Sequence, residues 1–296
     1  MHTENDFSLD DQGQDPLSDT EENINTSMVY NDPSASFVAE FYDGYSFRNL
    51  IGYLRGTNCK GSFSFSNNLI RYVQDDPSHT LLNQIEIQTY ELTHYEFNSK
   101  SEEILIGVNI ADVWCITKTI RKKDVVRLYK KWDDLNLYIQ IISNNNRSCG
   151  WDNVSIIRPI NDLVLTVYEM PGYGWDEKQP NFTVPSTDFS RICTALASIK
   201  CDFIEIHGFP QGATFKSMTK GDIVGRVETL GNCDLNAPRS PIYKVKSSMV
   251  KALAKLNNLS NMGTIKFYLE PNHPMKLLSQ IGTYGTLYIY IRSSFK

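Results

Sequence analysis

The order of helical and strand-like segments most constrains this 296-residue chain, because the same order occurs twice. After Asp32-Pro33 the chain reads as strand, helix and several strands, then again as strand, helix and several strands. Residues 181–296 repeat that succession. The repeat predicts an α+β fold of two similar domains, in each of which an antiparallel sheet packs on two helices.

Periodicity assigns the segments within each half. Helices are predicted within residues 46–56, 104–120, 186–199 and 242–260, and the third is expected to begin at Ser186, a good N-cap residue. Strands are predicted within residues 36–43, 61–67, 69–74, 81–97, 104–109, 125–131, 135–142, 182–184, 201–208, 213–220, 222–231, 242–246, 264–270, 275–281 and 286–294. The Asn67-Asn68 turn predicts that the strands on either side of it form a hairpin.

Charge divides the chain into a tail and a body. Residues 1–33 contain nine acidic residues and no Lys or Arg, which leaves 25 acidic and 29 basic residues, a net charge of +4, for the body. An acidic segment poor in apolar residues is typical of disorder, and a basic body favours a polyanionic partner, although solubility alone also explains such a charge. The predicted organisation is a disordered tail 1–33, a domain 34–168, a linker 169–180 and a domain 181–296.

Cysteine spacing and hydropathy favour a reducing compartment. The six cysteines have no C-x-x-C spacing, no apolar signal segment opens the sequence, and no apolar run approaches the roughly 18 residues that cross a bilayer. We therefore expect free thiols and no membrane partner.

Each predicted helix has a polar or basic face opposite its apolar stripe. Helical spacing places on these faces Arg48, Gly52 and Arg55; Cys115, Lys118 and Lys122; Arg191, Thr194 and Ser198; and Ser248, Lys251 and Lys255. One such face is ordinarily only solvated, but four faces of one sign, nearly free of Asp and Glu, indicate contact with phosphates. The sequence has no recognition-helix cluster, zinc-finger spacing or base-stacking motif, so we predict sequence-independent contact with the backbone of a duplex.

Catalytic motifs are missing from the sequence. The five histidines have no metal-ligand spacing, and the chain has no P-loop, dinucleotide fingerprint or G-x-S-x-G elbow. The prediction is a protein that is not an enzyme and uses neither metal nor cofactor.

Several short motifs in order resemble the sliding clamps of the proliferating-cell nuclear antigen (PCNA) type. VPSTDFSRICTAL resembles the start of the clamp's second domain, IGVNIADVWCITK its G-V-N-L helix, and DPSHTLLNQIEI its D-S-S-H-V-x-L-V segment. KALAKLNNLS followed by NHPMKLLSQIGTYGTLYIYI resembles the last helix and the closing strands. The resemblance covers residues 35–296 and implies a homotrimeric ring around double-stranded DNA, with helices lining the hole and sheets forming the outer wall.

The resemblance also implies partners and site residues. Lys118, Arg191 and Lys255 match basic residues of the family's hole, and Arg55 matches if a gap is allowed. Arg48, Lys122 and Lys251 are added from helical spacing. The expected partners are a DNA polymerase and other replication or repair proteins carrying clamp-binding peptides, together with a clamp-loader ATPase, in the nucleus or at a cytoplasmic replication site if the chain is viral.

An outer peptide pocket is a further expectation from the resemblance. It would be formed by His79, Pro171, Tyr173, Pro274 and Tyr290. The chain departs from the family at Pro171 and Tyr173, where an aliphatic pair is usual, and at Arg292-Ser293, where a small residue and a proline are usual, so its partner peptides are expected to differ from the usual motif.

Two strands are expected to join neighbouring subunits, and other assemblies stay open. Residues 162–170 and 222–231 match the family's subunit-edge strands, and an unpaired apolar edge favours an oligomer. The alternatives are a monomeric or dimeric processivity factor that holds DNA by charge, and a clamp-derived viral transcription factor or virion protein.

Overall fold

The computed structural model describes residues 34–143, 153–160, 179–199, 201–218, 224–234, 242–260 and 263–292. Residues Ser34–Lys296 form one compact unit, separate from Met1–Pro33. The predicted tail 1–33 and most of the predicted linker 169–180 lie outside the described residues, and the domain boundaries remain a prediction.

The described residues form four α-helices and two short 3₁₀ helices. Their bounds are α1 Gly44–Leu54, η1 Thr89–Glu91, α2 Ile110–Thr117, α3 Ser186–Ala197, α4 Ser247–Leu253 and η4 Ala254–Asn258. All four α-helices were predicted from the apolar spacing. Phe47, Leu50 and Leu54 of α1 are at most 2% exposed, as are Phe189 and Leu196 of α3. Full burial of such a side chain stabilises the fold by about 1.5–3 kcal/mol.

Seventeen strands are present in the described part of the chain. In the first half they are β1 Ala35–Phe41, β2 Lys60–Ser66, β3 Leu69–Asp75, β4 Leu81–Gln88, β5 His94–Phe97, β6 Glu103–Asn109, β7 Val125–Lys131, β8 Leu137–Ile142 and β9 Asn153–Ile157. In the second half they are β10 Phe182–Pro185, β11 Phe203–Phe209, β12 Gln211–Met218, β13 Val224–Asn232, β14 Ile242–Lys246, β15 Thr264–Tyr268, β16 Met275–Ile281 and β17 Gly285–Ile291.

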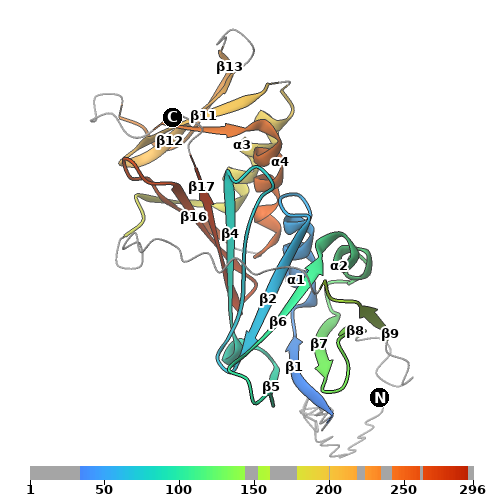
Figure 1. The fold of residues 1–296 in the computed structure, drawn as a ribbon. Coiled ribbons are helices and arrows are strands. Elements are labelled where there is room, and N and C mark those ends of the chain that lie inside the picture. The colour runs from blue at the N-terminus through green and yellow to red at the C-terminus, as the bar shows by residue number, and fades with distance from the viewer. Residues whose placement is uncertain are drawn as a thin grey trace, which may run out of the picture. The chain divides into compact units, whose positions relative to one another are not determined.

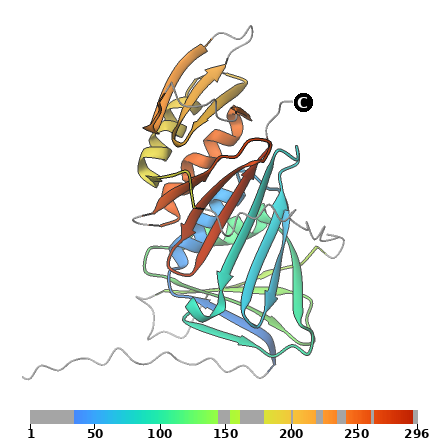
Figure 2. The same cartoon turned by 90° about the vertical axis from the view of Figure 1, so that its left-hand side faces the viewer.

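These strands form three sheets whose pairing is antiparallel throughout. The orders are β5-β1-β7-β8-β9, β10-β15-β16-β17-β4-β3-β2-β6 and β13-β12-β11-β14. The predicted hairpin is confirmed, since β2 pairs with β3 across Asn67-Asn68. The eight-stranded sheet contains strands of both halves, because β17 pairs with β4 over its whole length; the two lie side by side in Figures 1 and 2.

The repeat predicted from the sequence is visible in the order of the strands. The run β1-β7-β8-β9 corresponds to β10-β15-β16-β17, and the run β4-β3-β2-β6 corresponds to β13-β12-β11-β14. In each half the two runs belong to different sheets, and the pairing of β17 with β4 joins one run of each half into the eight-stranded sheet. The fold is therefore the same unit used twice, joined by one strand pair.

Two local predictions were wrong. The single strand predicted over residues 81–97 is interrupted by η1, where the Thr89 amide donates to Asn68 and its hydroxyl to Asn67, so the chain turns and β5 pairs with β1 instead. The predicted N-cap Ser186 is the first residue of α3, and the N-cap position is occupied by Pro185 without a side-chain hydrogen bond. Ser186 is buried, and its amide donates to the Gly263 carbonyl at 2.9 Å.

Candidate nucleic-acid interface

The helices of both halves form one layer. α2 packs against α1, α1 against η4, and α3 against both α4 and η4. Two hydrogen bonds join the halves within this layer: Asn49 Nδ2 donates to the Asn258 carbonyl at 2.6 Å, and Lys255 Nζ donates to the Gly52 carbonyl at 2.8 Å. Figures 1 and 2 show the helices following one another along one side of the eight-stranded sheet.

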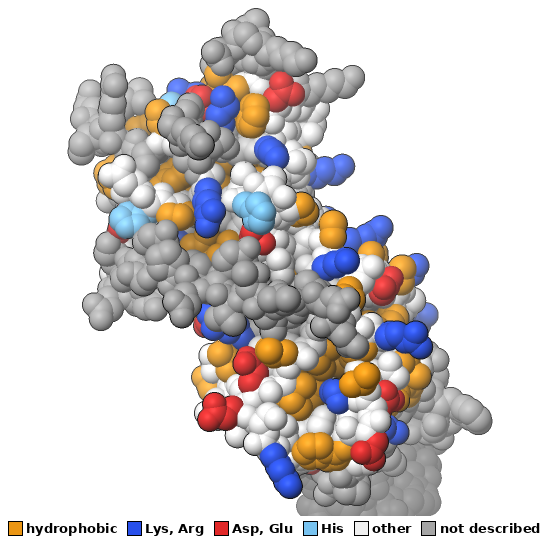
Figure 3. Space-filling model, viewed as in Figure 1, with side chains coloured by type: hydrophobic (Ala, Val, Ile, Leu, Met, Phe, Trp, Pro, Cys, Tyr) orange, Lys and Arg blue, Asp and Glu red, His pale blue; other side chains and the backbone are white. Residues whose placement is uncertain are grey.

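The solvent side of this layer carries most of the predicted basic residues. Arg55, Lys118, Lys122, Arg191, Lys251 and Lys255 are all exposed. In Figure 3, Lys and Arg side chains follow one another along the margin where the helices lie in Figure 1. The structure thus places on one layer residues that are up to 200 positions apart in sequence.

Arg48 and Gly52 depart from the prediction for α1. Arg48 is half-buried, because its Nη1 donates to the Ile120 carbonyl at 3.0 Å and its guanidinium lies 5.3 Å from the centre of the Tyr45 ring. Gly52 is buried because the Trp114 ring of α2 covers it. Arg48 therefore ties α1 to the segment after α2 and presents less charge to solvent than expected.

Three of the predicted lysines lie outside the α-helices. α2 ends at Thr117, so Lys118 is its C-cap and Lys122 lies in the following loop, 6.0 Å from the Tyr45 ring centre. α4 ends at Leu253, and Lys255 belongs to η4. All three side chains still extend the basic layer, because they are exposed next to the ends of α2 and α4.

The sequence reasoning missed further residues of this layer. Arg121 and Lys123 are exposed beside Lys122, and the run Arg121-Lys122-Lys123 was a signal that would have found them. Tyr45 and Trp114 support cations on the layer, and no spacing rule distinguishes them from ordinary core aromatics.

Three cations meet where α1 reaches η4. Burial lowers the pKa of Lys255, and the neighbouring positive charges of Arg55 and Lys251 lower it further. The structure records no ion pair of these three residues with an acidic side chain of the described chain. A bound anion would relieve the repulsion among them.

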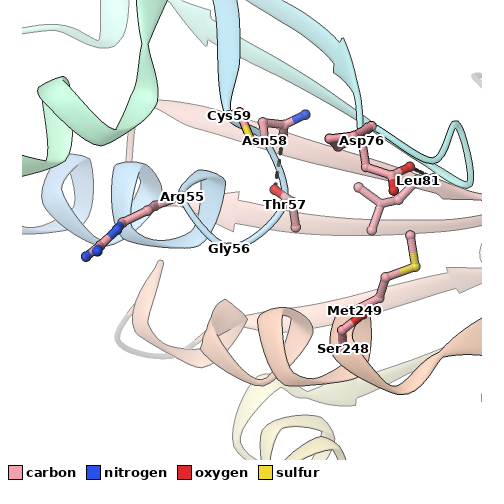
Figure 4. Close-up of a pocket in the computed structure, with 10 residues that line it drawn as sticks. Arg55, Gly56, Thr57, Asn58, Cys59, Asp76, Leu81, Ser248 and Met249 are labelled. Atoms are coloured by element: carbon pink, nitrogen blue, oxygen red, sulfur yellow. Dashed lines mark hydrogen bonds between the residues drawn. The ribbon is translucent and has the colours of Figure 1, made fainter. Parts of the chain in front are cut away.

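A cavity of about 250 Å³ lies beside this point, between the end of α1, the β3–β4 turn and α4. Figure 4 shows Arg55 pointing away from it, while Asp76, Leu81 and Met249 close its far side. Burial raises the pKa of Asp76, but hydrogen bonds from the Ser78 hydroxyl and from three backbone amides outweigh this effect, so its pKa lies below the ordinary value. The polar side chains of Thr57, Asn58 and Asp76 in its lining thus already have partners within the fold.

The predicted outer-pocket residues are only partly described. Tyr290 lies opposite Lys276 and Leu82 in the sheet, Pro274 precedes β16, and His79 lies in the β3–β4 turn that Arg292 reaches with a 2.9 Å bond to Thr80. These three predicted residues therefore lie at the same end of the sheet. Tyr290 is on the face opposite the helices. Pro171 and Tyr173 lie outside the described residues.

A buried lysine is an unexpected feature of that outer face. Lys276 is 2% exposed, and its Nζ lies 5.1 Å from the ring centres of Tyr268 and Tyr288 and 5.8 Å from that of Tyr290. The alternation of Met275-Lys276-Leu277 was not enough to predict its burial, because the rings come from two other strands.

Two sheet edges among the described residues correspond to the two strands that join the halves, β9 to β17 and β13 to β4. β9 is the edge of the five-stranded sheet and β13 the edge of the four-stranded sheet. Val154 and Ile156 of β9 are 45% and 59% exposed, and Val227 of β13 is 50% exposed. Of the predicted edge strand 222–231, residues 224–231 belong to β13, a sheet edge, and its pairing with a neighbouring subunit stays a prediction. Residues 162–170 lie outside the described residues, and the first-half edge within the described chain is β9.

Metal and membrane features are also missing from the described part of the chain. There, no three His, Cys, Asp or Glu side chains are grouped so that they would hold a metal ion. None of the described helices combines the length and hydropathy needed to cross a membrane.

The chain is similar to known clamps in structure and sequence. PCNA from Entamoeba histolytica aligns with a TM-score of 0.71 and 19% identity, over 88% of this chain and all of that chain. The PCNA2–PCNA3 complex from Sulfolobus tokodaii aligns with a TM-score of 0.69 and 16% identity, over 87% of this chain and 99% of the matched chain. The chain therefore has the PCNA-type clamp fold, as its motifs predicted.

A viral protein is similar to the chain in sequence. A probable DNA polymerase sliding clamp of Acanthamoeba polyphaga mimivirus is 25% identical over 232 residues, which are 75% of this chain and 46% of that protein. The match thus spans about half of the viral protein. No protein-family model matches the chain.

Proposed function

We propose that this chain is a DNA sliding clamp that encircles duplex DNA as a ring and tethers a DNA polymerase to its template. The observation that carries the proposal is the helix layer, in which both halves present exposed cations on one side. Such a layer suits the phosphate backbone of a duplex, because phosphate contacts hold DNA without reading its sequence. The clamp fold and the similarity to a viral clamp support the same function.

The internal repeat supports closure into a ring. Within the chain, β17 of the second half pairs with β4 of the first. β9 and β13 are the equivalents of β17 and β4, and among the described residues each is paired on one side only. If the repeat continues from one copy to the next, β9 of one copy lies beside β13 of its neighbour. Such a head-to-tail contact forms a closed ring when a whole number of copies completes a full turn. We propose three copies, as the resemblance implies.

The register of this contact follows from the ladders. In the first half, Ile139 of β8 pairs with Leu128 and Ser155; in the second, Leu277 of β16 pairs with Phe267 and Ile289. Matching the two ladders makes Ser155 the equivalent of Ile289. The preceding residues, Val154 and Tyr288, are therefore equivalent as well. Likewise, Ile87 of β4 pairs with Ile70, and Leu230 of β13 pairs with Ala213, so Ile87 and Leu230 are equivalent. Gln84 and Val227 lie three residues before them and are therefore equivalent too. Tyr288 lies opposite Gln84 within the chain. Val154 of one copy should therefore lie opposite Val227 of the next, which would bury two exposed apolar side chains.

The proposed partners follow from the same function. A polymerase would dock by a peptide on the outer face, at the end of the sheet where His79, Pro274 and Tyr290 gather, and a loader ATPase would open the ring. The clamp itself would act without catalysis, metal or cofactor.

Charge reversal of the helix layer tests the proposal. Replacing Lys118, Arg191 and Lys255 together by Glu should abolish stimulation of a polymerase on a long template, because three phosphate contacts become repulsive. All three side chains are exposed, so the melting temperature should change little. A matched control places Glu at Lys60, Lys100 and Lys266, which are exposed outside the helix layer. Unchanged stimulation by the helix-layer variant would contradict the proposed function.

A further inference from the structure

The Trp114 ring occupies a specific place between α1 and α2. The ring lies against Gly52, where an added Cβ would be only 2.8 Å from its Cζ3 atom. The tryptophan is half-buried and borders the solvent side of the helix layer. Glycine at residue 52 thus makes room for an indole ring at the surface that faces the proposed DNA.

Arg55 lies over that ring. Its guanidinium carbon is 5.7 Å from the ring centre, within the range of a cation–π contact, and the side chain remains exposed. A flexible arginine loses rotamer freedom when it binds a phosphate. Stacking on an indole restricts the side chain before DNA arrives, so less freedom is lost on binding.

Lys255 is fixed at the same point from the other half of the chain. Its Nζ donates to the Gly52 carbonyl at 2.8 Å, and two further ammonium hydrogens are available to another acceptor. Lys251, one turn earlier, adds a third positive charge close enough to influence Lys255. Gly52 therefore contacts the ring that supports Arg55, and its own carbonyl holds Lys255.

We propose that Trp114 is a positioning residue that, with Gly52, arranges Arg55 and Lys255 into one pre-organised contact for a DNA phosphate at the junction of the two halves. The inference rests on the proposed function and refines it, because it makes this junction, rather than four equal helix faces, the main contact with the duplex. Arg191 of α3 is the natural comparison, since it is exposed without a ring contact among the described residues.

Binding of a short fluorescein-labelled duplex, followed by anisotropy from about 50 to 200 mM salt, tests the inference. Arg55→Ala should weaken binding and reduce the salt slope by about 1. Trp114→Leu should weaken binding about threefold at low salt, whereas Trp114→Phe, which keeps a ring, should retain most of the affinity. In the Arg55→Ala background, Trp114→Leu should have little further effect, because the cation that it supports is gone.

Two controls separate positioning from folding. Trp132→Leu removes an exposed tryptophan of the β7–β8 turn, away from the helix layer, and should leave DNA binding unchanged. If Trp114→Leu lowers the melting temperature markedly, Trp114→Met fills more of the space without a ring and replaces it in the same cycle.

The outcomes distinguish the inference from the proposed function. Loss of affinity with Trp114→Leu that is equal in both backgrounds, or no loss at all while Arg55→Ala weakens binding, would refute the positioning role alone. Binding of the unmodified protein that does not depend on salt, or that Arg55→Ala leaves unchanged, would refute the proposed DNA contact and the positioning role together.

Discussion

At the scale of single residues, tertiary contacts determine which basic side chains are held against the protein and which are exposed. Arg48 lies in α1 and Arg55 is the C-cap residue of the same helix, yet Arg48 is held by a carbonyl and a tyrosine while Arg55 stays exposed over a tryptophan. Helical spacing gave both the same role. The difference arises because the loop after α2 covers only one end of α1.

Asp76 shows how one carboxylate can define a turn. Its side chain accepts hydrogen bonds from the amides of Ser78, Thr80 and Leu81 and from the Ser78 hydroxyl, and it is 8% exposed. These bonds fix the β3–β4 turn beside which α4 packs, and His79 in that turn has a positive φ of 54°.

We expect Asp76→Asn to lower the free energy of unfolding by about 1–3 kcal/mol, since a charged acceptor of several amides is replaced by a weaker one. The pKa of Asp76 is lower in the folded than in the unfolded chain, so its contribution is present above the unfolded value near 4 and is lost as pH falls through the folded value. Melting curves at neutral and acid pH should therefore converge for the two proteins at low pH. Asp133→Asn, at an exposed site, is the control; a constant difference at all pH values would contradict the assignment.

At the scale of elements, a buried polar network joins α1 to the eight-stranded sheet. Asn83 of β4 is fully buried, accepts from the Tyr53 hydroxyl at 2.7 Å, and donates to Asn58 and Thr57 at 2.7 and 3.0 Å. Asparagine at this position interrupts the apolar pattern of β4, so the sequence alone favours an apolar residue there. The network sets the position of the α1 end, and with it the position of Arg55.

Asn83→Leu should destabilise the protein by about 1–3 kcal/mol, because the Tyr53 hydroxyl and the Asn58 amide oxygen lose a buried partner. Adding Tyr53→Phe to Asn83→Leu should cost less than the sum of the two single changes. Urea unfolding of the four proteins measures the coupling. Strictly additive losses would mean that the two side chains do not act as a pair.

At the scale of the whole molecule, β9 and β13 are each paired on one side only within the described residues, and their exposed side chains predict the assembly. Light scattering should give about three times the 33.8 kDa chain mass, and this mass should persist on dilution. Val227→Glu should lower it to that of the single chain, since a carboxylate opposite Val154 is buried without a partner. Val154→Lys added to Val227→Glu should restore much of the assembly by charge pairing.

Leu105→Glu is the matched control for this prediction. Leu105 is 52% exposed on β6, an edge strand that the repeat does not place in the contact. A mass that falls equally for both Glu variants would contradict the β9–β13 register. A single-chain mass for the unmodified protein would leave the fold in place and favour the open, charge-based form of DNA binding.

The repeat of elements, the four apolar helix stripes and the basic residues opposite them were all determined by the sequence, because each is a local pattern of period two or 3.6. The tertiary structure alone decided the break after β4, the edge role of β9, the burial of Lys276 and the meeting of Trp114, Arg55 and Lys255 around Gly52. Each of these depends on residues distant in sequence, whose proximity no local period encodes. The packing of α2 and η4 on α1 therefore decides which cations of the helix layer are held in place and which remain free in solvent.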